Sequence, residues 1–450
     1  MKHRITILAA GLSLSFAGSA QTPPAPAAAT NATAAAHAAP MAVRPIVLKA
    51  AHLFDGRTGQ MTSPGLVVVQ GQKILGVGTN ATYPDGARVI DLGDATLLPG
   101  FIDAHVHIAD DHDDDWAAGI YNGMLRFPAE QAFHAAHNAK VTLEAGFTTV
   151  RVVGAPDFVD VSLRNAINDG LAEGPRMLVA GHAIGSTGGH CDSAPYPTNR
   201  VIPATPMEGV CNGPEECRLA TRDQMKYGAD VIKICASGGV LSESDPVDVP
   251  QLTPDELHAI MSEAHSWGRK VAAHAHGDRA AKLAVEAGVD SIEHGSFVQP
   301  DTLRLMKAKG VYLVPTRMTQ VWVNDKANTY PPKIGAKARA AYNAHAAMMK
   351  NAMQIGVPIA FGTDAAVFPH GLNAQEFGDY VDLGMAPATA LMTSSQGAAK
   401  LLGVDKETGT LEAGKFADVV AVPGDVLKNI RATEHPVFVM KQGAVVRGGK

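Results

Sequence analysis

The sequence predicts an α/β protein whose main part is a (β/α)8 TIM-type barrel, with a small β-sandwich built from both chain ends. Three observations support this fold. Buried-looking strands alternate with amphipathic helical stretches through the middle of the chain, which is the pattern of parallel βα units. Short β-rich runs broken by Gly, Asp and Pro occupy both ends. The 450 residues, 46% of them hydrophobic, can bury one large core.

Residues 1–20 have the features of a secretory signal peptide. A positive start at Lys2–Arg4 precedes a short apolar run, Ile5–Phe16, and a small-residue cleavage site follows at Gly18–Ala20. A membrane anchor needs about 20 apolar residues, and this run is shorter. We therefore expect a periplasmic or secreted protein with no membrane attachment after cleavage. Residues 21–43 are rich in Ala, Pro and Thr, so we expect a disordered linker.

The two β-rich ends, residues 44–98 and 405–450, are expected to form one domain. Neither end is long enough alone for a stable core, and together they suit a small β-sandwich. The strands expected in them are Gly65–Val69, Lys73–Val77, Ala417–Val422, Val437–Met440 and Ala444–Arg447.

Residues 99–404 are expected to form the barrel, with an active site where the parallel strands end. Thr253 before Pro254 is typical of a capped helix start. The expected strands are Gly100–Ile108, Thr148–Val153, Arg176–His182, Val231–Ala236, Lys270–His276, Ser291–His294, Tyr312–Pro315 and Pro358–Asp364. The expected helices include Glu130–Glu144, Thr253–Trp267, Gly277–Ala287 and Ala336–Ile355.

The charge balance argues against a nucleic-acid partner. The formal net charge is −6 and no long run of Lys or Arg occurs. The sequence pI is about 6.3, so the chain has no basic field that would attract a polyanion.

Four cysteines bear on the redox environment. Cys191, Cys211 and Cys217 fall in one Gly/Pro-rich stretch, and Cys235 lies inside an expected strand. An exported protein meets oxidising conditions, so we expect one loop disulfide. The sequence leaves the pairing open, and it also leaves open the alternative that all four thiols are unpaired.

His105 and His107 end the first barrel strand. Because side chains two apart on a strand share a face, both imidazoles are expected to point into the barrel and converge on one metal. The alternative is a pair of hydrogen-bonded core histidines.

Lys233 places a charge inside the apolar run of the fourth strand. A buried ammonium is costly, so this lysine must be neutral, paired or chemically changed. Reaction with CO2 would give a carbamate, an anionic ligand able to bridge two cations. An ion pair with a neighbouring acid is the alternative.

Three further strands end in polar residues that can bind metal. His274 and His276 end the fifth strand, His294 the sixth and Asp364 the eighth. With Lys233 and the first histidine pair, these residues supply imidazoles and anions suited to two divalent cations bridged by hydroxide.

Taken in order, these motifs resemble those of the amidohydrolase superfamily, over about residues 45–447. Within it, three local runs are similar to a branch containing Xaa-Pro dipeptidase-like carboxypeptidases, ochratoxin-hydrolysing amidases and imidazolonepropionase-related enzymes. The superfamily motifs are Pro99–His107, Lys233, His274, His294 and Gly362–Asp364, and the branch runs are Gly188–His190, Ala273–Gly277 and Ser291–Gly295.

The resemblance implies two divalent metal ions, with zinc as the default for such ligands. It implies one ion held by His105, His107 and Asp364. The other ion would be held by His274 and His294. A carboxylated Lys233 would bridge both ions.

The resemblance also implies substrate contacts near the metals. His276 would contact the substrate, and His190 and His182 are candidates for holding the substrate or the developing oxyanion. Arg317 and Tyr227 could bind a carboxylate, but the sequence does not place either of them in the pocket. Cys191 follows His190 where relatives often have Gly, which leaves the conformation of that loop open.

The expected reaction is hydrolysis of an amide bond by metal-activated hydroxide, with Asp364 as the base. The expected substrate is a dipeptide or N-acyl-L-amino acid with a free C-terminal carboxylate, ochratoxin A included. The alternatives are a cyclic-amide hydrolase related to imidazolonepropionase and a metal-binding protein without catalysis. The resemblance further implies a homo-oligomer.

Overall fold

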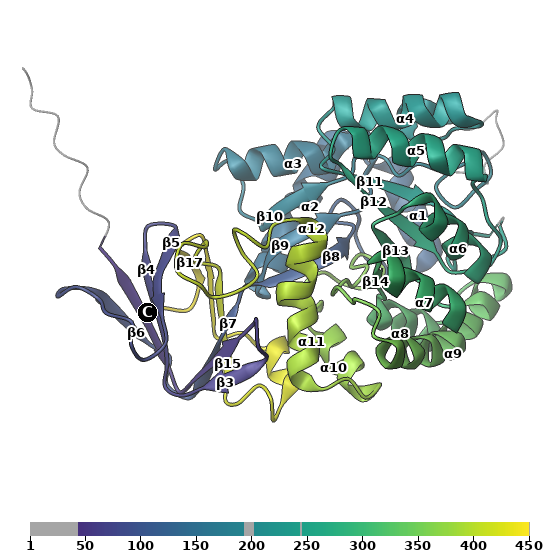
Figure 1. Ribbon diagram of the computed structural model, residues 1–450. Helices are drawn as coiled ribbons and strands as arrows, with labels where there is room; N and C mark the ends of the chain where they lie inside the picture. Colours follow the sequence, from purple (N-terminus) through teal and green to yellow (C-terminus); the bar gives the residue numbers. More distant parts are fainter. Residues whose placement is uncertain (1–43, 193–201, 244, 450) are drawn as a thin grey trace, which may run out of the picture. The chain divides into compact units, whose positions relative to one another are not determined.

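The computed structural model describes residues 44–192, 202–243 and 245–449 (Figure 1). The expected signal peptide and linker, residues 1–20 and 21–43, lie outside the described residues. In the described part of the chain, α-helices and β-strands are mixed as the sequence predicts.

Seven parallel strands form two sheets in the middle of the chain. One sheet has the order β10-β9-β8 and the other β11-β12-β13-β14. The parallel register brings the carboxyl ends of neighbouring strands together, as where Cys235 lies beside His274 and Ala275 beside His294. The strands are β8 (Phe101–Val106), β9 (Phe147–Val152), β10 (Arg176–Val179), β11 (Val231–Cys235), β12 (Lys270–Ala275), β13 (Ser291–His294) and β14 (Tyr312–Val314).

Single bridges connect the two sheets on both sides. Ile359 bridges to Leu313 of β14, and Ala365 bridges to Val106 of β8, so the segment between them lies between these two strands. On the other side, Ile184 bridges to Ile234 of β11. The hydrophobic core runs through both sheets.

The expected eighth strand, Pro358–Asp364, is not a regular strand. Only its two flanks form bridges, at Ile359 and at Ala365, and Asp364 at its end has a φ of 64°, outside the β region. The Thr363 N–H also lies 3.1 Å from the Asp103 carboxylate. Backbone hydrogen bonds nevertheless join the segment to both neighbouring strands, from Leu313 N–H to the Pro358 carbonyl and from Asp364 N–H to the His105 carbonyl.

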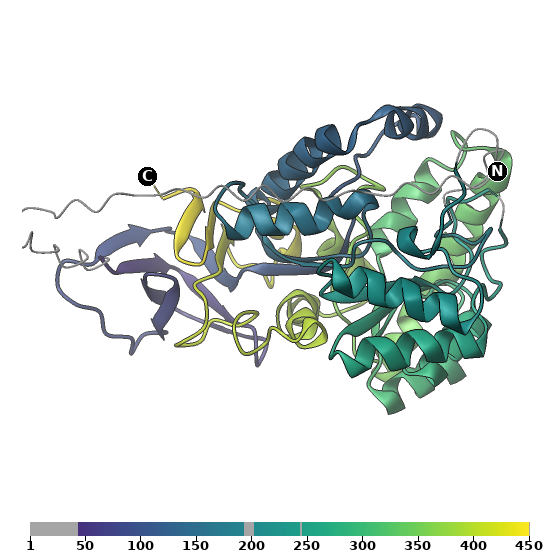
Figure 2. The same ribbon diagram turned by 90° about the horizontal axis from the view of Figure 1, so that it is seen from above.

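The four expected helices are all present, within a few residues of the expected ends. Thr253 caps its helix in a capping box with Glu256. Figures 1 and 2 show helices on the outer side of the parallel strands. The helices are α1 (Trp116–Leu125), α2 (Pro128–Glu144), α3 (Val159–Asn168), α4 (Pro214–Lys226), α5 (Pro254–Ser266), α6 (Asp278–Ala287), α7 (Pro300–Lys309), α8 (Arg317–Asp325), α9 (Pro332–Ile355), α10 (Gln375–Asp382), α11 (Pro387–Met392) and α12 (Ala398–Leu402).

The two chain ends form two further sheets, with the orders β5-β4-β1-β6 and β17-β16-β15-β7-β2-β3. The second sheet joins both ends, because β15 pairs antiparallel with β7. One apolar cluster draws side chains from both sheets, among them Val67, Leu97 and Phe438. The strands are β1 (Ile46–Ala50), β2 (His52–Asp55), β3 (Gln60–Thr62), β4 (Gly65–Gln70), β5 (Lys73–Val77), β6 (Arg88–Asp91), β7 (Ala95–Pro99), β15 (Val419–Pro423), β16 (Phe438–Lys441) and β17 (Ala444–Arg447).

Two disulfides join all four cysteines. Cys191 pairs with Cys235, with Cα atoms 5.8 Å apart, and Cys211 pairs with Cys217, with Cα atoms 5.0 Å apart. The structure therefore contains one disulfide more than the single loop disulfide expected from the sequence. The additional bond forms because β11 brings Cys235 beside the loop that carries Cys191.

Among the described residues, no helix is both long enough and apolar enough to span a bilayer.

Candidate metal centre and active-site cavity

A cavity of about 530 Å³ opens at the carboxyl ends of the parallel strands. Strands β8, β11, β12 and β13 and the segment after Ile359 each place a side chain of the expected ligand set on its wall. The cavity-lining residues among those expected in the site are His105, His107, His190, Lys233, His274, His276, His294 and Asp364.

One group of potential ligands consists of His105, His107 and Asp364. The Oδ1 atom of Asp364 lies 3.3 Å from His105 Nε2 and 3.4 Å from His107 Nε2. The Asp364 carboxylate therefore faces one ring nitrogen of each histidine. The group therefore offers an anionic oxygen and two imidazole nitrogens around one point.

A buried ion pair orients His105. Its Nδ1 lies 2.7 Å from Oε2 of Glu293, whose Oε1 lies 2.8 Å from Nη2 of Arg151. Burial would raise the pKa of Glu293, yet Arg151 and His105 lower it to about 2, so it accepts hydrogen bonds only. The proton of His105 is thus on Nδ1, and its buried Nε2 has no hydrogen-bond partner among the described residues. A cation is the partner that such a nitrogen suits.

The other histidines of the proposed ligand set are oriented in the same way. His107 Nδ1 lies 3.3 Å from the Gly154 carbonyl, and His274 Nε2 lies 3.1 Å from the Gly238 carbonyl. Since carbonyls only accept, these nitrogens carry the hydrogen and leave the opposite nitrogen of each ring as a lone pair.

His294 follows the same rule through a hydroxyl. Its Nδ1 lies 2.8 Å from Thr316 Oγ1, which itself donates to the Pro315 carbonyl at 2.7 Å. The hydroxyl must then accept from His294 Nδ1, so His294 presents an unprotonated Nε2. His294 also has a φ of 69°, a strained value that occurs where a site requires it.

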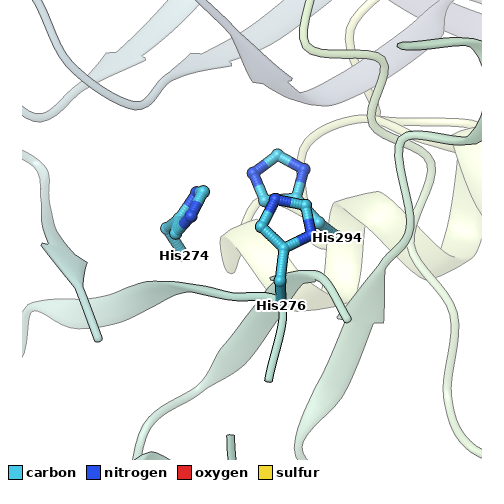
Figure 3. A group of neighbouring side chains, drawn as sticks. All are labelled: His274, His276 and His294. Atoms are coloured by element: carbon cyan, nitrogen blue, oxygen red, sulfur yellow. The ribbon is translucent and has the colours of Figure 1, made fainter. Parts of the chain in front are cut away.

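The second group of potential ligands contains His274, His276 and His294 (Figure 3). The rings of His276 and His294 are stacked, with centroids 4.9 Å apart and planes at 13°. The His274 ring stands across both, 4.8 Å from His276 and 4.7 Å from His294. One ring nitrogen of each histidine lies within 4.8 Å of those of the other two. Either His274 or His276 could therefore share a metal ion with His294.

Lys233 lies on β11 with 4% of its surface exposed, and it lines the cavity. Burial lowers its pKa to about 8, against the opposing effect of Glu293 and Asp364. A lowered pKa increases the neutral fraction of the amine near pH 7, and the neutral amine is the form that reacts with CO2.

His190 lies beside the second ligand group, on the loop after β10. Its ring centroid is 4.2 Å from that of His274. The Cys191–Cys235 disulfide ties the next residue to β11, two positions after Lys233. At Cys191, the described part of this loop is therefore linked covalently to the cavity wall.

Three candidate substrate contacts lie outside the cavity wall. The His182 ring packs edge-on against Phe158, 5.1 Å away, and Phe158 also contacts Tyr227. The Arg317 guanidinium lies over the Tyr342 ring at 4.4 Å. None of His182, Tyr227 and Arg317 is among the cavity-lining residues, because each side chain points toward a neighbouring helix or loop.

Sequence reasoning missed four residues that support the site: Asp103, Arg151, Glu293 and Asn373. Asp103 accepts from Thr363 Oγ1 at 2.6 Å and from Asn373 Nδ2 at 2.9 Å, and so ties the segment before Asp364 to β8. Burial raises the pKa of Asp103 to about 7. The signal that singled out Lys233, a charge inside an apolar strand, was also present for Arg151 and Glu293.

The chain is similar to several known proteins. The sequence pattern of the amidohydrolase family matches residues 96–448. An ochratoxinase of Aspergillus niger is 33% identical over 369 residues, 79% of this chain and 75% of that protein. An imidazolonepropionase of Hyphomonas neptunium is 22% identical over 381 residues, 79% of this chain and 86% of that protein.

A solved structure is similar along nearly the whole chain. The crystal structure of a Xaa-Pro dipeptidase with bound methionine in its active site has a TM-score of 0.86 and 38% identity. The match covers 90% of this chain and 100% of that chain. Such similarity implies an α/β fold of the TIM-like barrel type.

Proposed function

Because the chain belongs to the amidohydrolase family and is a hydrolase of amide bonds, we propose that it is an exported two-metal enzyme. Its substrate is a dipeptide or N-acyl-L-amino acid with a free C-terminal carboxylate. The observation that carries the proposal is the set of four buried or half-buried histidines that each have one nitrogen held by an acceptor. The opposite nitrogens are left for cations in one cavity.

The residues present fit two divalent ions. We assign His105, His107 and Asp364 to one ion and His274 and His294 to the other, with zinc as the default metal. A carboxylated Lys233 would supply a further anionic oxygen ligand to both ions. When bound, the ions make water acidic enough to attack near neutral pH and polarise the carbonyl under attack.

Asp364 moves the proton in this scheme. Its carboxylate accepts a proton from the attacking water as the new C–O bond forms. It then returns that proton to the leaving nitrogen as the C–N bond breaks, which releases a carboxylic acid and an amine.

The proposed substrate class rests on the relatives. The Xaa-Pro dipeptidase and the ochratoxinase both match at 30% identity or more, whereas the imidazolonepropionase matches at 22%. We therefore favour a linear amide, with ochratoxin A in the panel of substrates, over a cyclic amide. His276 and His190 are the proposed substrate contacts, because both line the cavity beside the ligand groups.

We further propose that residues 99–404 form an eight-unit barrel and that residues 44–98 with 405–450 form a β-sandwich. Residues 1–20 would direct the protein to the periplasm or the medium, followed by the linker, residues 21–43. The sheet shared by β7 and β15 supports the two-ended domain.

We also propose a homo-oligomer, supported by an exposed apolar surface over α1 and the start of α2. Helix α1 buries none of its residues. Five large apolar side chains on this segment are exposed. A cluster of exposed apolar side chains of this kind is typical of a protein–protein contact surface. These residues, called the α1–α2 surface below, are Tyr121, Met124, Leu125, Phe127 and Phe133.

Amino-acid release tests the proposed function. The mature, zinc-loaded protein is incubated with N-acyl amino acids, Xaa-Pro dipeptides and ochratoxin A, with a chelator-treated control. Metal-dependent release of the C-terminal amino acid supports the proposal and shows the preferred side chain. Turnover of cyclic amides alone would move the assignment to the alternative, and metal binding with no turnover of any amide would contradict both.

A further inference from the structure

Gln320 brings an unsatisfied amide to the wall of the active-site cavity. It lies near the start of α8, is 2% exposed and lines the cavity. Its buried Oε1 has no hydrogen-bond partner among the described residues. An amide oxygen that leaves water without gaining a donor destabilises the folded protein, so a buried amide of this kind needs an explanation. A bound substrate that supplies the donor is one, because this amide lines the cavity.

The backbone that carries Gln320 is held in place by buried hydrogen bonds. Glu376, which is fully buried, accepts a hydrogen bond from the Arg317 backbone N–H at 2.6 Å. The hydroxyl of Thr319, the residue before Gln320, donates to the Thr363 carbonyl at 2.8 Å. Thr363 immediately precedes the base proposed above. The start of α8 is therefore anchored beside the reacting groups, while the Gln320 oxygen stays unpaired.

An acidic loop, residues 110–115, lies along the same helix. Five of its six residues are aspartates. The His112 ring lies 5.4 Å from the Trp322 ring, and Asp114 forms an ion pair with Lys326, the residue that ends α8. These two contacts place the loop beside the helix that carries the unsatisfied amide.

The acidic loop makes the cavity wall negative. Asp110, Asp111 and Asp113 all line the cavity. Arg126 is the single arginine on the wall that the described residues form, and it pairs with Asp111 at 2.6 Å. This pairing leaves the charges of the other two aspartates uncompensated on the wall. A cationic group of the substrate is therefore attracted to this side of the cavity, and a carboxylate is repelled.

We propose that Gln320 is a specificity-determining residue, which accepts a hydrogen bond from the free amino group of a dipeptide substrate. This inference rests on the proposed function and narrows it, because N-acyl amino acids and ochratoxin A have no such group. A carboxylate only accepts hydrogen bonds and cannot satisfy Gln320 Oε1. A neutral N–H is a weaker donor than an ammonium group and gains nothing from the acidic loop.

Alanyl-phenylalanine and N-propionyl-phenylalanine test the proposal, because they differ only in the amino group. The wild type should favour the dipeptide in kcat/KM. In Gln320→Leu this preference should fall by about ten- to a hundredfold, the size of a hydrogen bond to a charged group. Gln320→Glu keeps an acceptor oxygen and should retain the preference. Gln354→Leu, a matched change at an exposed position on α9, should leave it unchanged.

Thermal unfolding separates recognition from folding. Because Gln320 Oε1 has no partner among the described residues, Gln320→Leu should melt at or above the temperature of the wild type. An equal loss of kcat/KM on both substrates would overturn the proposal, since a merely structural role produces that result. Loss of the preference in Gln320→Glu would also overturn it, because the amide would then contact the substrate through Nε2.

Binding without turnover distinguishes this inference from the proposed function. Calorimetric titration gives Kd for both compounds in Asp364→Asn, with and without Gln320→Leu, and in the wild type if it does not cleave them. A dipeptide preference that depends on Gln320, without cleavage by the wild type, would leave this inference standing and contradict the proposed function. Cleavage of both compounds with a preference unchanged in Gln320→Leu would do the reverse, and binding of neither would contradict both.

Discussion

Asp364 combines two roles that a single substitution can separate. Asp364→Asn keeps the shape and one metal-binding oxygen but removes the base. We expect turnover to fall by a factor of about 10² to 10⁴, with the melting temperature and most of the bound metal retained. Metal analysis, thermal unfolding and amide hydrolysis give the three readouts. Activity close to that of the wild type would contradict the role.

The identity of the second metal's ligand is also a residue-scale question, because His274 and His276 both converge on His294. We expect His274→Ala to lose one metal ion per chain. His276→Ala should keep both ions and lose kcat/KM instead. Metal content measured on both variants decides between them, and the reverse pattern would exchange the two assignments.

Lys233 can be tested by chemical rescue. Lys233→Ala removes the amine that a carbamate requires, so metal content and rate should both fall. Added acetate or propionate should restore part of each, because a free carboxylate can take the bridging position. A fully active Lys233→Ala variant that gains nothing from added acid would argue against a carbamate.

At the scale of elements, one ion pair couples three strands. Arg151 on β9 contacts Glu293 on β13, which contacts His105 on β8, and all three side chains are buried. Arg151→Met leaves the Glu293 carboxylate buried without its main partner. We expect the free energy of unfolding to fall by about 3–5 kcal/mol, measured by urea denaturation.

The control for this prediction is Arg304→Met, which removes an exposed pair on α7. Arg304 and Asp301 keep 63% and 97% of their side-chain surface exposed. The free energy of unfolding should therefore change by less than about 1 kcal/mol. Equal losses in the two variants would show that the Arg151–Glu293 pair has no special role in coupling the strands.

At the scale of the whole molecule, the α1–α2 surface predicts self-association. A ten-residue helix with no fully buried residue has little tertiary packing to stabilise it in water. The surface of α1 carries no acidic or basic side chain, so two copies meet there without like-charge repulsion. Helix α1 also contributes Trp116 and Ile120 to the cavity wall, which links assembly to the site.

We expect the wild type to be an oligomer by light scattering, and Phe127→Asp with Phe133→Asp to give a smaller species. Leu171→Asp is the matched control, because Leu171 is 82% exposed but lies outside this surface. A monomeric wild type, or a double variant of unchanged mass, would contradict the prediction. Figure 2 shows α1 and α2 at the edge of the molecule, where a second copy has access.

Local pattern was enough for much of this protein. The alternation of strands and helices predicted the parallel βα units because burial periodicity is a property of neighbouring residues. Histidine spacing and strand-end position predicted that His105, His107, His274 and Asp364 would meet, because parallel strands end at one edge. The expected eighth strand lies between its two neighbours but is not a regular strand, because Asp103 of β8 takes hydrogen bonds from both the backbone and the side chain of Thr363.

The sequence by itself determined which side chains gather at the strand ends and what kind of chemistry they suit. Only the tertiary structure decided which cysteines pair and that His182 packs against Phe158 instead of lining the cavity. These outcomes depend on hydrogen bonds and contacts between segments far apart in the chain. A periodic pattern of apolar and polar residues contains no information about them, because it records only which face of its own element each residue occupies.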